Sequence, residues 1–522
     1  MVDLPGGFLP AWRSNALAKS MTKDIVWDNL YIVWDAMIIV CHTIKATIWK
    51  GETGVPMKDK QAKWCPELGD FAGPKYRAIV AAMQRDIQSG ALPPGTRLPT
   101  QRDLAWSLQV NLSTVTEAFR EATRLRLITG EVGRGTYVLP GNDAVQLYAI
   151  DKGGNHDTID LSTIVPARAF SSEDLRQSFA TLLARDNLSD IMDYPTPDLM
   201  QRCRSAIGQF YQPRGFHPRQ SDMFPCAGAQ AALFAALQWI AKPDLPVLVE
   251  ELTFPGMKIA ARQMGLRLVP VAMDEKGILP ADLDRAARAS GARTLVISPI
   301  LQNPTGATMD ADRRAAIVAL AEKLDLLVIE EDVYGGFTKE PPLSLQLAGR
   351  SILVGGLSKL VAPGPRFGFV IPMLEGNEAR LPEQNFAIDE LVHVTSWMAA
   401  PIMLELCCHW IESGEINRHM EWQRQEARTR QSLVRRKLGL PPLGRKPAAP
   451  HLWIGAGKDS PFAGLSGDQA AAKARAAGVE IVPASTFCAG RMLSDGIRLC
   501  ATSPRDRADV TEACKRLRKA WS

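Results

Sequence analysis

The stretch GGLSKLVAPGPRFGF, residues 355–369, decides the fold of most of this 522-residue chain. Lys359 follows a serine, and Arg366 comes seven positions later, across a segment with two prolines and a glycine. Because proline restricts the backbone, this segment is a stiff turn that holds two cationic side chains at a fixed offset. A surface lysine needs no such setting, so we interpret Lys359 and Arg366 as parts of one binding site.

Short apolar runs alternate with helical segments around this stretch. The helical segments ADLDRAARASG and MDADRRAAIVALAEKL have the expected period and composition. The apolar, β-branched runs are LPVLVE (245–250), RLVPV (267–271), TLVISPI (294–300), LLVIEED (326–332) and SILVGGLSK (351–359). This alternation predicts an α/β domain over residues 160–518, with a mostly parallel sheet and helices on both faces.

Polar side chains follow three of these runs. Asn303 stands in a Pro-Gly turn after 294–300, Asp332 and Tyr334 end or follow 326–332, and Ser358 and Lys359 close 351–359. Ligands of open α/β sheets bind at the carboxyl ends of the strands. We therefore expect these side chains to converge on one crevice.

The residue types in this set suit pyridoxal 5'-phosphate. Lys359 can form a Schiff base with the aldehyde if its pKa is lowered enough to make it a nucleophile. Asp332 can keep the ring nitrogen protonated, so that the ring acts as an electron sink. Tyr334 and Asn303 can hydrogen-bond the phenolate oxygen. Alone, Lys359 could be a solvated lysine and Asp332 a helix cap, but their shared position favours the cofactor site.

A phosphate group needs a second set of donors. Ala229 and Gln230 open a helix in the segment AGAQ, and backbone N–H groups at a helix N-terminus bind anions. Ser358 and Arg366 add a hydroxyl and a guanidinium. We predict that these four residues hold the cofactor phosphate.

The segment 73–140 has a different pattern. After Pro74, KYRAIVAAMQRDIQSG has apolar residues at helical spacing. We expect Thr100 to cap a short helix, QRDLAWSLQV, and Ser113 to cap a second one, STVTEAFREATRLRLI, after a tight turn. The tail TGEVGRGTYVLP predicts a hairpin that bends around Arg134. Together they form a winged helix-turn-helix.

Charge favours double-stranded DNA as the partner of this segment. It carries nine Lys or Arg and five Asp or Glu, whereas the whole chain has a net charge of only +5. The first side chains of the second helix, Ser113, Thr114 and Thr116, are expected to face base edges, and Arg134 a minor groove. The alternative is a small helical scaffold with solvated arginines.

The remaining features of the sequence limit the kinds of protein that it can be. Nine scattered cysteines have no paired metal-binding spacing and fit reduced thiols in a cytoplasm, and we expect no metal site. Residues 1–56 include an apolar stretch, but Asp and Lys interrupt it, so a membrane span is not expected. We interpret 1–56 as a doubtful extension with Met57 as the natural start, and 141–159 as a flexible linker. His217, His409 and His451 are scattered, and we expect them to be structural.

The N-terminal motifs resemble the GntR family of bacterial regulators. LPTQRDLA, LSTVTEAF and GRGTYV stand where the family has its two helices and its wing. The resemblance implies that Arg102 contacts DNA. Leu112 replaces the arginine that usually precedes the recognition helix, and Arg126 replaces the usual glycine before the wing.

The C-terminal motifs resemble fold-type I, class I/II aminotransferases, which implies a smaller α+β lobe at the C-terminus. GLSKLVAPGPRFG matches the lysine signature except that Gly356 replaces a serine, and NPTG also matches. The resemblance places Phe254 over the cofactor ring, Arg498 on a substrate α-carboxylate, and Tyr194 on the phosphate of a neighbouring subunit. Phe254 could instead be core, and Arg498 an ordinary salt-bridge partner.

Together the two halves resemble MocR/GabR-type regulators. The resemblance implies a cytoplasmic, nucleoid-associated transcription factor that senses pyridoxal phosphate, or a small amine or amino acid, through Lys359. It also implies a homodimer, for which a domain-swapped head-to-tail arrangement is one option, and which binds a DNA operator. The alternative is a true aminotransferase, converting an amino acid to a 2-oxo acid, with an accessory DNA-binding domain.

Overall fold

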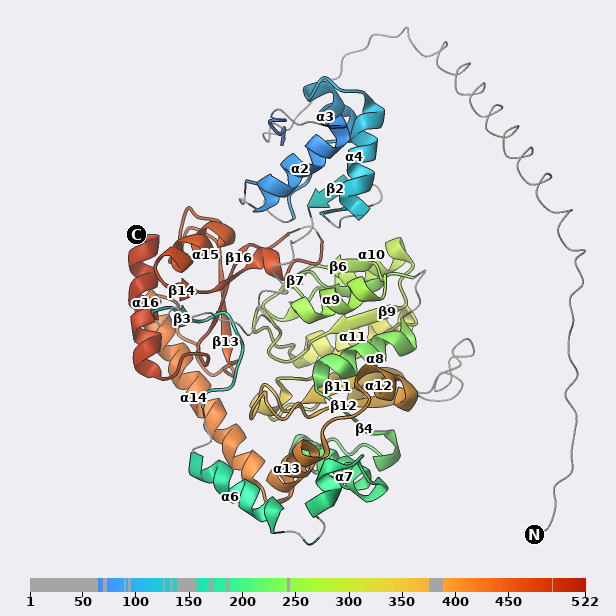
Figure 1. The fold of residues 1–522 in the computed structure, drawn as a ribbon, viewed down its shortest axis with the longest axis vertical. Helices are drawn as coiled ribbons and strands as arrows, with labels where there is room; N and C mark the ends of the chain where they lie inside the picture. The colour runs from blue at the N-terminus through green and yellow to red at the C-terminus, as the bar shows by residue number, and fades with distance from the viewer. Residues whose placement is uncertain are drawn as a thin grey trace, which may run out of the picture. The chain divides into compact units, whose positions relative to one another are not determined.

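The computed structural model describes residues 64–68, 73–88, 91–92, 95–124, 127–131, 135–138, 157–168, 172–184, 186, 188–241, 245–374, 388–490 and 492–522. Figure 1 shows a small N-terminal domain and a large C-terminal domain, which are treated separately. The expected extension, residues 1–56, lies outside the described residues, as do Arg134 and residues 141–156 of the expected linker.

The small domain has three helices and a hairpin. They are α2 (Lys75–Gln88), α3 (Gln101–Ser107), α4 (Leu112–Arg124), β1 (Ile128–Glu131) and β2 (Gly135–Val138). The two strands are antiparallel, and residue 97 forms a further antiparallel bridge with Tyr137. Ile79, Leu104 and Val115, one from each helix, are fully buried in a common core. The predicted winged helix-turn-helix is confirmed.

The predicted cap of α3 is found in the structure, but the predicted cap of α4 is not. The Thr100 hydroxyl accepts a hydrogen bond from the Asp103 N–H, as expected for a capping residue. Helix α4 begins at Leu112, and the carbonyl of Asn111 accepts from the N–H groups of Thr114 and Val115. The prediction that Ser113 caps this helix was therefore wrong by two positions.

A seven-stranded sheet forms the centre of the large domain. Its order is β4-β12-β11-β10-β9-β5-β6, and only β12 runs antiparallel to its neighbours. The strands are β4 (Phe224–Cys226), β5 (Val247–Glu250), β6 (Leu268–Val271), β9 (Thr294–Ile297), β10 (Leu327–Glu331), β11 (Arg350–Gly356) and β12 (Gly368–Leu374). This is the mostly parallel sheet predicted from the sequence.

Helices cover both faces of this sheet. One face packs against α8 (Ala229–Ile240), α9 (Pro255–Gln263) and α12 (Ile388–Ser396) through a core that includes Val249, Val296 and Ile329. The other face packs against α10 (Pro280–Ser290) and α11 (Ala311–Lys323) through Leu248, Leu295 and Val328. Because alternate residues of each strand enter the two cores, both faces are apolar and the sheet is fully covered. A short hairpin, β7 (Met273–Asp274) and β8 (Gly277–Ile278), precedes α10.

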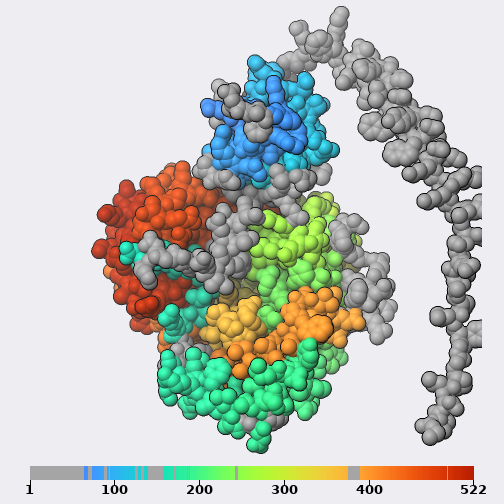
Figure 2. Space-filling model, in the orientation of Figure 1, coloured from blue at the N-terminus to red at the C-terminus, as the bar shows by residue number. Residues whose placement is uncertain are grey.

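A third group of helices packs beside the sheet. It contains α6 (Ser172–Leu183), α7 (Pro197–Tyr211) and α13 (Pro401–Glu412). Figure 2 shows the blue-green segment of α6 and α7 beside the orange segment that contains α13, and these helices are in contact. They share one core with the ends of β11 and β12.

The smaller C-terminal lobe is built on a three-stranded antiparallel sheet, β13-β16-β15. It consists of α14 (Glu415–Leu438), β13 (His451–Gly455), α15 (Gly467–Ala476), β14 (Val479–Glu480), β15 (Val482–Pro483), β16 (Gly496–Cys500) and α16 (Arg507–Trp521). Strand β3 (Ile159–Asp160) pairs with β14, so residue 159 of the expected linker already belongs to this lobe. The predicted α/β fold with a smaller α+β lobe is confirmed.

Two further observations concern the described residues as a whole. The eight cysteines among them are all free thiols. No single described helix is long and apolar enough to cross a membrane, and only α12 and α13 taken together, bent by 118°, pass a test of length and composition.

Candidate functional site

The start of α8 and the turn before β12 form an anion cradle. Gly228, with φ of 93°, precedes the helix, and no side chain caps its first N–H groups. A Cβ on Gly368 would lie 2.3 Å from the carbonyl carbon of Gly228, so only glycine lets β12 approach the helix start this closely. The uncapped N–H groups and the positive end of the helix dipole favour an anion here.

Arg366 and Ser358 supply the cationic and hydroxyl donors of this cradle. A Cβ on Gly228 would lie 2.3 Å from Nη2 of Arg366, which places the guanidinium over the helix start. Nη1 of Arg366 donates to Oγ of Ser358 at 3.3 Å. Arg366 has φ of 54°, a conformation that costs a side-chain-bearing residue energy and marks a functional constraint.

Gly356 explains the one departure from the lysine signature. A Cβ at this position would lie 2.9 Å from the carbonyl oxygen of Phe367 and 3.2 Å from Cα of Gly368. A serine would push β12 away from β11. The missing hydroxyl therefore reflects the close contact between these strands.

Lys359 lies near three other charged or polar residues, Arg366, Arg498 and Cys500. Its Nζ donates to the carbonyl oxygen of Ile164 at 2.8 Å. Burial lowers the pKa of Lys359 from 10.5 to about 8; the Cys500 thiol opposes this, and the charges of Arg498 and Arg366 add to it. A lysine with a lowered pKa is the nucleophile required for attack on an aldehyde.

Arg498 and Asn303 meet beside this lysine. Nη1 of Arg498 donates to Oδ1 of Asn303 at 2.9 Å, and Nη2 donates to the carbonyl oxygen of Ser162. The guanidinium carbon lies 4.8 Å from the ring centre of Phe487, and Nε is buried without a partner among the described residues. An arginine that is held in place but keeps a free N–H donor is suited to bind a carboxylate.

Tyr334 packs against a residue that sequence reasoning missed. Its ring centre lies 5.2 Å from that of His451, which begins β13. Nε2 of His451 lies 3.0 Å from the carbonyl oxygen of Gln302. Burial, with help from the charge of Arg498, lowers the pKa of His451 to about 3, so the ring is neutral at pH 7. No motif surrounds His451 in the sequence, so its place beside Tyr334 could not be predicted.

Phe254 and Gln230 lie side by side near the start of α9. A Cβ on Gly256 would lie 2.1 Å from Cζ of Phe254 and 2.2 Å from Oε1 of Gln230. Nε2 of Gln230 donates to the carbonyl oxygen of Gly256 at 3.1 Å. Gln230 lies in the first turn of α8, directly after Ala229, which opens the helix, and Phe254 lies beside it.

Asp332 lies differently from the expectation. Nη2 of Arg214 donates to Oδ1 at 2.9 Å, Nη1 donates to Oδ2, and the Tyr211 hydroxyl donates to Oδ2 at 2.9 Å. The Asp332 side chain has no exposed surface. Its two oxygens are committed to protein donors, and the structure does not direct them into the crevice. Nothing in the sequence pattern connects Arg214 with this position.

Tyr194 lies apart from the other predicted cofactor residues. It is 62% exposed, and its ring centre is 6.4 Å from that of Trp397. It lines a hollow of about 930 Å³ together with residues of α7, β4 and α12, and no other predicted cofactor residue does so. An exposed aromatic residue in this position agrees with a role toward another subunit.

The predicted DNA residues lie on the surface of the small domain. Arg102, Ser113 and Thr116 are exposed, and Thr114 is half-buried. Oγ1 of Thr116 donates to Oε1 of Gln101 at 2.9 Å, which connects the start of α4 to the start of α3.

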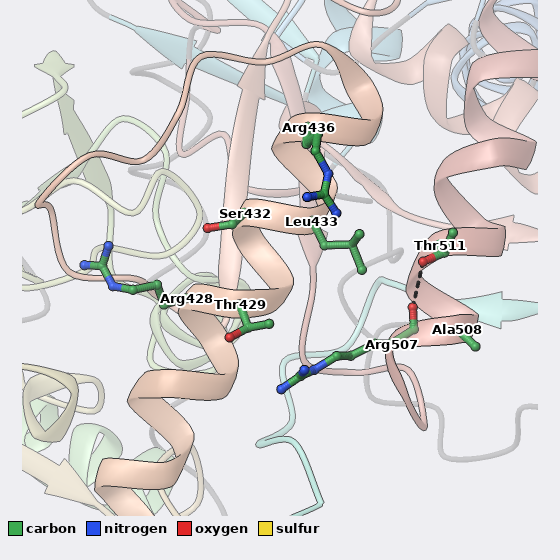
Figure 3. Close-up of a pocket in the computed structure, with 8 residues that line it drawn as sticks. All are labelled: Arg428, Thr429, Ser432, Leu433, Arg436, Arg507, Ala508 and Thr511. Carbon is green, nitrogen blue, oxygen red and sulfur yellow. Dashed lines mark hydrogen bonds between the residues drawn. The ribbon is translucent and has the colours of Figure 1, made fainter.

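A second hollow, of about 690 Å³, lies between α14 and α16 (Figure 3). Two of the three arginines that line it already have protein partners. Arg507 forms an ion pair with Glu426, and Arg428 donates to the carbonyl oxygens of Gly444 and Lys446. No predicted site residue lines it.

Comparison with known families identifies both parts of the chain. The model for aminotransferase class I and II matches residues 167–517, and the model for bacterial regulatory proteins of the gntR family matches residues 75–138. The chain belongs to the aminotransferase class I and II family. With its gntR-type domain it has the domain arrangement of MocR/GabR-type regulators.

Individual relatives agree with this assignment. YdeF of Bacillus subtilis (strain 168), named as an uncharacterized HTH-type transcriptional regulator, is 26% identical over 461 residues, which are 87% of this chain and 96% of YdeF. PdxR of Corynebacterium glutamicum, an HTH-type pyridoxine biosynthesis transcriptional regulator, is 25% identical over 372 residues, 69% of this chain and 78% of PdxR. An archaeal alanine:glyoxylate aminotransferase has a TM-score of 0.62 at 21% identity, covering 73% of this chain and 93% of its own, which shows the fold.

Proposed function

We propose that this protein is a DNA-binding transcriptional regulator that uses pyridoxal 5'-phosphate and senses either this cofactor or a small amine or amino acid through Lys359. The observation that carries the proposal is Lys359 itself, with a pKa lowered to about 8, between Arg366 and Arg498. The same chain carries a basic winged helix-turn-helix.

The residues of the crevice fit the cofactor. The anion cradle at Gly228, with Arg366 and Ser358, offers donors of the kind a phosphate requires. The LysN aminotransferase of Thermus thermophilus, solved with N-(5'-phosphopyridoxyl)-L-leucine, shares the fold with a TM-score of 0.60 at 22% identity, covering 70% of this chain and 92% of its own. When bound, the cofactor supplies an aldehyde that condenses with an amine and a ring that withdraws electrons.

Each residue then has a definite task. Lys359 would be the amine that condenses with the cofactor aldehyde, with loss of one water, and at pH 7 about a tenth of it is uncharged and able to do so. Asn303 and Tyr334 would orient the ring oxygen, and Phe254 would cover the ring. The unpartnered Nε of Arg498 leaves this arginine able to take a carboxylate of an effector.

The DNA side of the proposal depends on a homodimer. Exposed Tyr194 would reach the cofactor phosphate of a partner subunit, as in a head-to-tail or domain-swapped dimer. Two small domains would then read two half-sites of an operator through Arg102, Ser113, Thr114, Thr116 and Arg134. We place the protein in the cytoplasm, associated with the nucleoid.

Regulation requires that the effector bind two states of the protein with different affinity. An amine effector that took the place of Lys359 on the cofactor would leave the lysine free and change its charge. Its neighbours Arg366 and Arg498 lie on different lobes, one before β12 and one on β16, so a change in the relative position of the lobes would be the physical readout.

A second candidate function is transamination of an amino acid to a 2-oxo acid. It is favoured by one observation: Lys359, Asn303 and Arg498, which such a reaction needs, all lie together. Steady turnover of an amino donor with a 2-oxo acid would support it.

The proposal is tested with full-length protein supplied with pyridoxal 5'-phosphate. We expect an absorbance band at the edge of the visible range that borohydride removes and that Lys359→Ala never forms. We also expect a footprint near a gene start that candidate amines alter in the wild type and not in Lys359→Ala. A colourless wild type, or a footprint equally responsive in the variant, would contradict it.

A further inference from the structure

Three consecutive acidic residues lie at the end of β10: Glu330 and Glu331 are its last two residues, and Asp332 follows it. Glu330 accepts from the N–H groups of Leu343 and Ser344, and burial, together with the nearby charge of Asp332, raises its pKa. Glu330 and Asp332 therefore lie on one side. Glu331 lies on the other, because its strand neighbour Ile329 packs into the core of α8 and successive side chains of a strand alternate.

The side that carries Glu331 is also the side of the anion cradle. Helix α8, whose start holds Gly228 and Ala229, packs on the face of Ile329 and Val296. Oγ of Ser298, two residues after Val296, donates to Oε2 of Glu331 at 3.3 Å. A phosphate bound at the start of α8 would therefore lie on the same side of the sheet as Glu331.

The two carboxylates also differ in how far their hydrogen-bonding capacity is used. Asp332 accepts from Arg214 through both oxygens and from Tyr211, and its side chain is fully covered. Among the described residues, the side-chain donor to Glu331 is the Ser298 hydroxyl, at 3.3 Å, and Glu331 keeps 6% of its surface exposed. Burial raises the pKa of Glu331 to about 7, as expected for a carboxyl group without a cationic partner.

We propose that Glu331, and not Asp332, is the carboxylate that pairs with the ring nitrogen of the bound cofactor. This inference rests on the proposed function. Glu331 would hold the proton between its carboxyl group and the ring nitrogen, and the carboxylate and the protonated ring would form a charged hydrogen bond. Asp332 has a structural role instead: with Arg214 and Tyr211 it stabilises the segment that follows β10.

The experiment compares Glu331→Gln, Glu331→Asp and Asp332→Asn in the full chain. Pyridoxal phosphate is titrated while the absorbance band is recorded, and thermal stability is measured separately. Loss of a charged hydrogen bond should weaken cofactor binding in Glu331→Gln by about tenfold to a hundredfold and shift the band. Glu331→Asp should recover part of the affinity. Asp332→Asn should melt earlier, yet its folded fraction should keep the wild-type band.

Two controls sharpen the result. Glu330→Gln changes a buried glutamate of the same strand on the opposite face, so it should lower stability and leave the band unchanged. If Asp332→Asn does not fold, Tyr211→Phe removes one donor from Asp332 and should also leave the band unchanged. With 1-deazapyridoxal phosphate, which lacks the ring nitrogen, wild type and Glu331→Gln should bind within about twofold of each other.

An unchanged band and affinity in Glu331→Gln would overturn the inference, and so would an altered band in folded Asp332→Asn. An equal deficit of Glu331→Gln with the deaza analogue would also overturn it, because the side chain would then not act on the nitrogen. Failure of the wild type to bind the cofactor is a different outcome, which would contradict the proposed function.

Discussion

The predicted DNA-binding surface and the predicted cofactor crevice differ in how their polar residues are held. Arg102, Ser113 and Thr116 of the small domain are exposed, and water solvates them in the absence of DNA. Around the predicted crevice, Arg498 is buried and donates to Asn303, and Asp332 is buried and accepts from Arg214. Side chains that are buried and hydrogen-bonded contribute to the free energy of unfolding, whereas solvated surface side chains contribute little. Substitutions in the two regions should therefore differ in what they damage.

The largest expected effect follows from the buried ion pair below the crevice. Arg214→Met leaves the Asp332 carboxylate buried with only Tyr211 as donor, and removing one partner of a buried pair costs about 3–5 kcal/mol. Urea denaturation followed by circular dichroism should show this loss in the large domain. The matched control is Arg219→Met, whose 80% exposed side chain pairs with Asp222 and should change stability by less than about 1 kcal/mol. Equal effects of the two substitutions would show that the Arg214 pair is not a structural anchor.

The next effect is on cofactor affinity. Arg366→Met removes the guanidinium that lies over the start of α8, and a charged hydrogen bond to phosphate contributes about 1.5–3 kcal/mol. Titration with pyridoxal phosphate should give a dissociation constant about tenfold to a hundredfold higher, while DNA affinity of the cofactor-free protein stays unchanged. A large loss of DNA affinity without cofactor would mean that the two regions are not separable in this way.

The reciprocal change lies in the small domain. Arg102→Ala should weaken operator binding by about tenfold and, if the arginine contacts a phosphate, lower the dependence of log affinity on log salt by about one unit. The melting temperature and the cofactor band should not move, because Arg102 is exposed. Electrophoretic mobility shifts at several salt concentrations measure this. A change in the cofactor band would contradict the separation of the two regions.

Titration of Lys359 sharpens the comparison, since burial gives it a pKa of about 8 instead of 10.5. The rate of cofactor attachment should rise about tenfold per pH unit below pH 8 and level off above it. The unfolded chain binds this proton more tightly, so the cofactor-free protein should also gain stability as the pH rises from about 8 to 10.5. Stopped-flow absorbance measures the rate. A rate that keeps rising up to pH 10 would mean that the pKa is not lowered.

The features that were predicted correctly are those that depend on short stretches of sequence. Strand–helix alternation indicated the covered sheet, and the turn between Lys359 and Arg366 indicated the crevice. The sequence did not distinguish the roles of the three consecutive carboxylates at the end of β10. Their roles depend on the side of the sheet that each one faces, and on Arg214, which lies 118 residues before Asp332. His451 was missed for the same reason, since its neighbours Tyr334 and Gln302 come from a distant part of the chain.

The smallest expected effects separate the two helix starts of the small domain. Thr100 accepts a capping hydrogen bond from the Asp103 N–H at 3.2 Å, so Thr100→Ala should destabilise this domain by about 1 kcal/mol. Ser113 lies inside α4 and is exposed, so Ser113→Ala should change stability by less than about 0.5 kcal/mol, and its effect should appear in DNA affinity instead. Thermal denaturation and operator binding of the same two variants test this. If Ser113→Ala proved the more destabilising, the start of α4 would lie two residues later than Leu112, and Ser113 would be its cap after all.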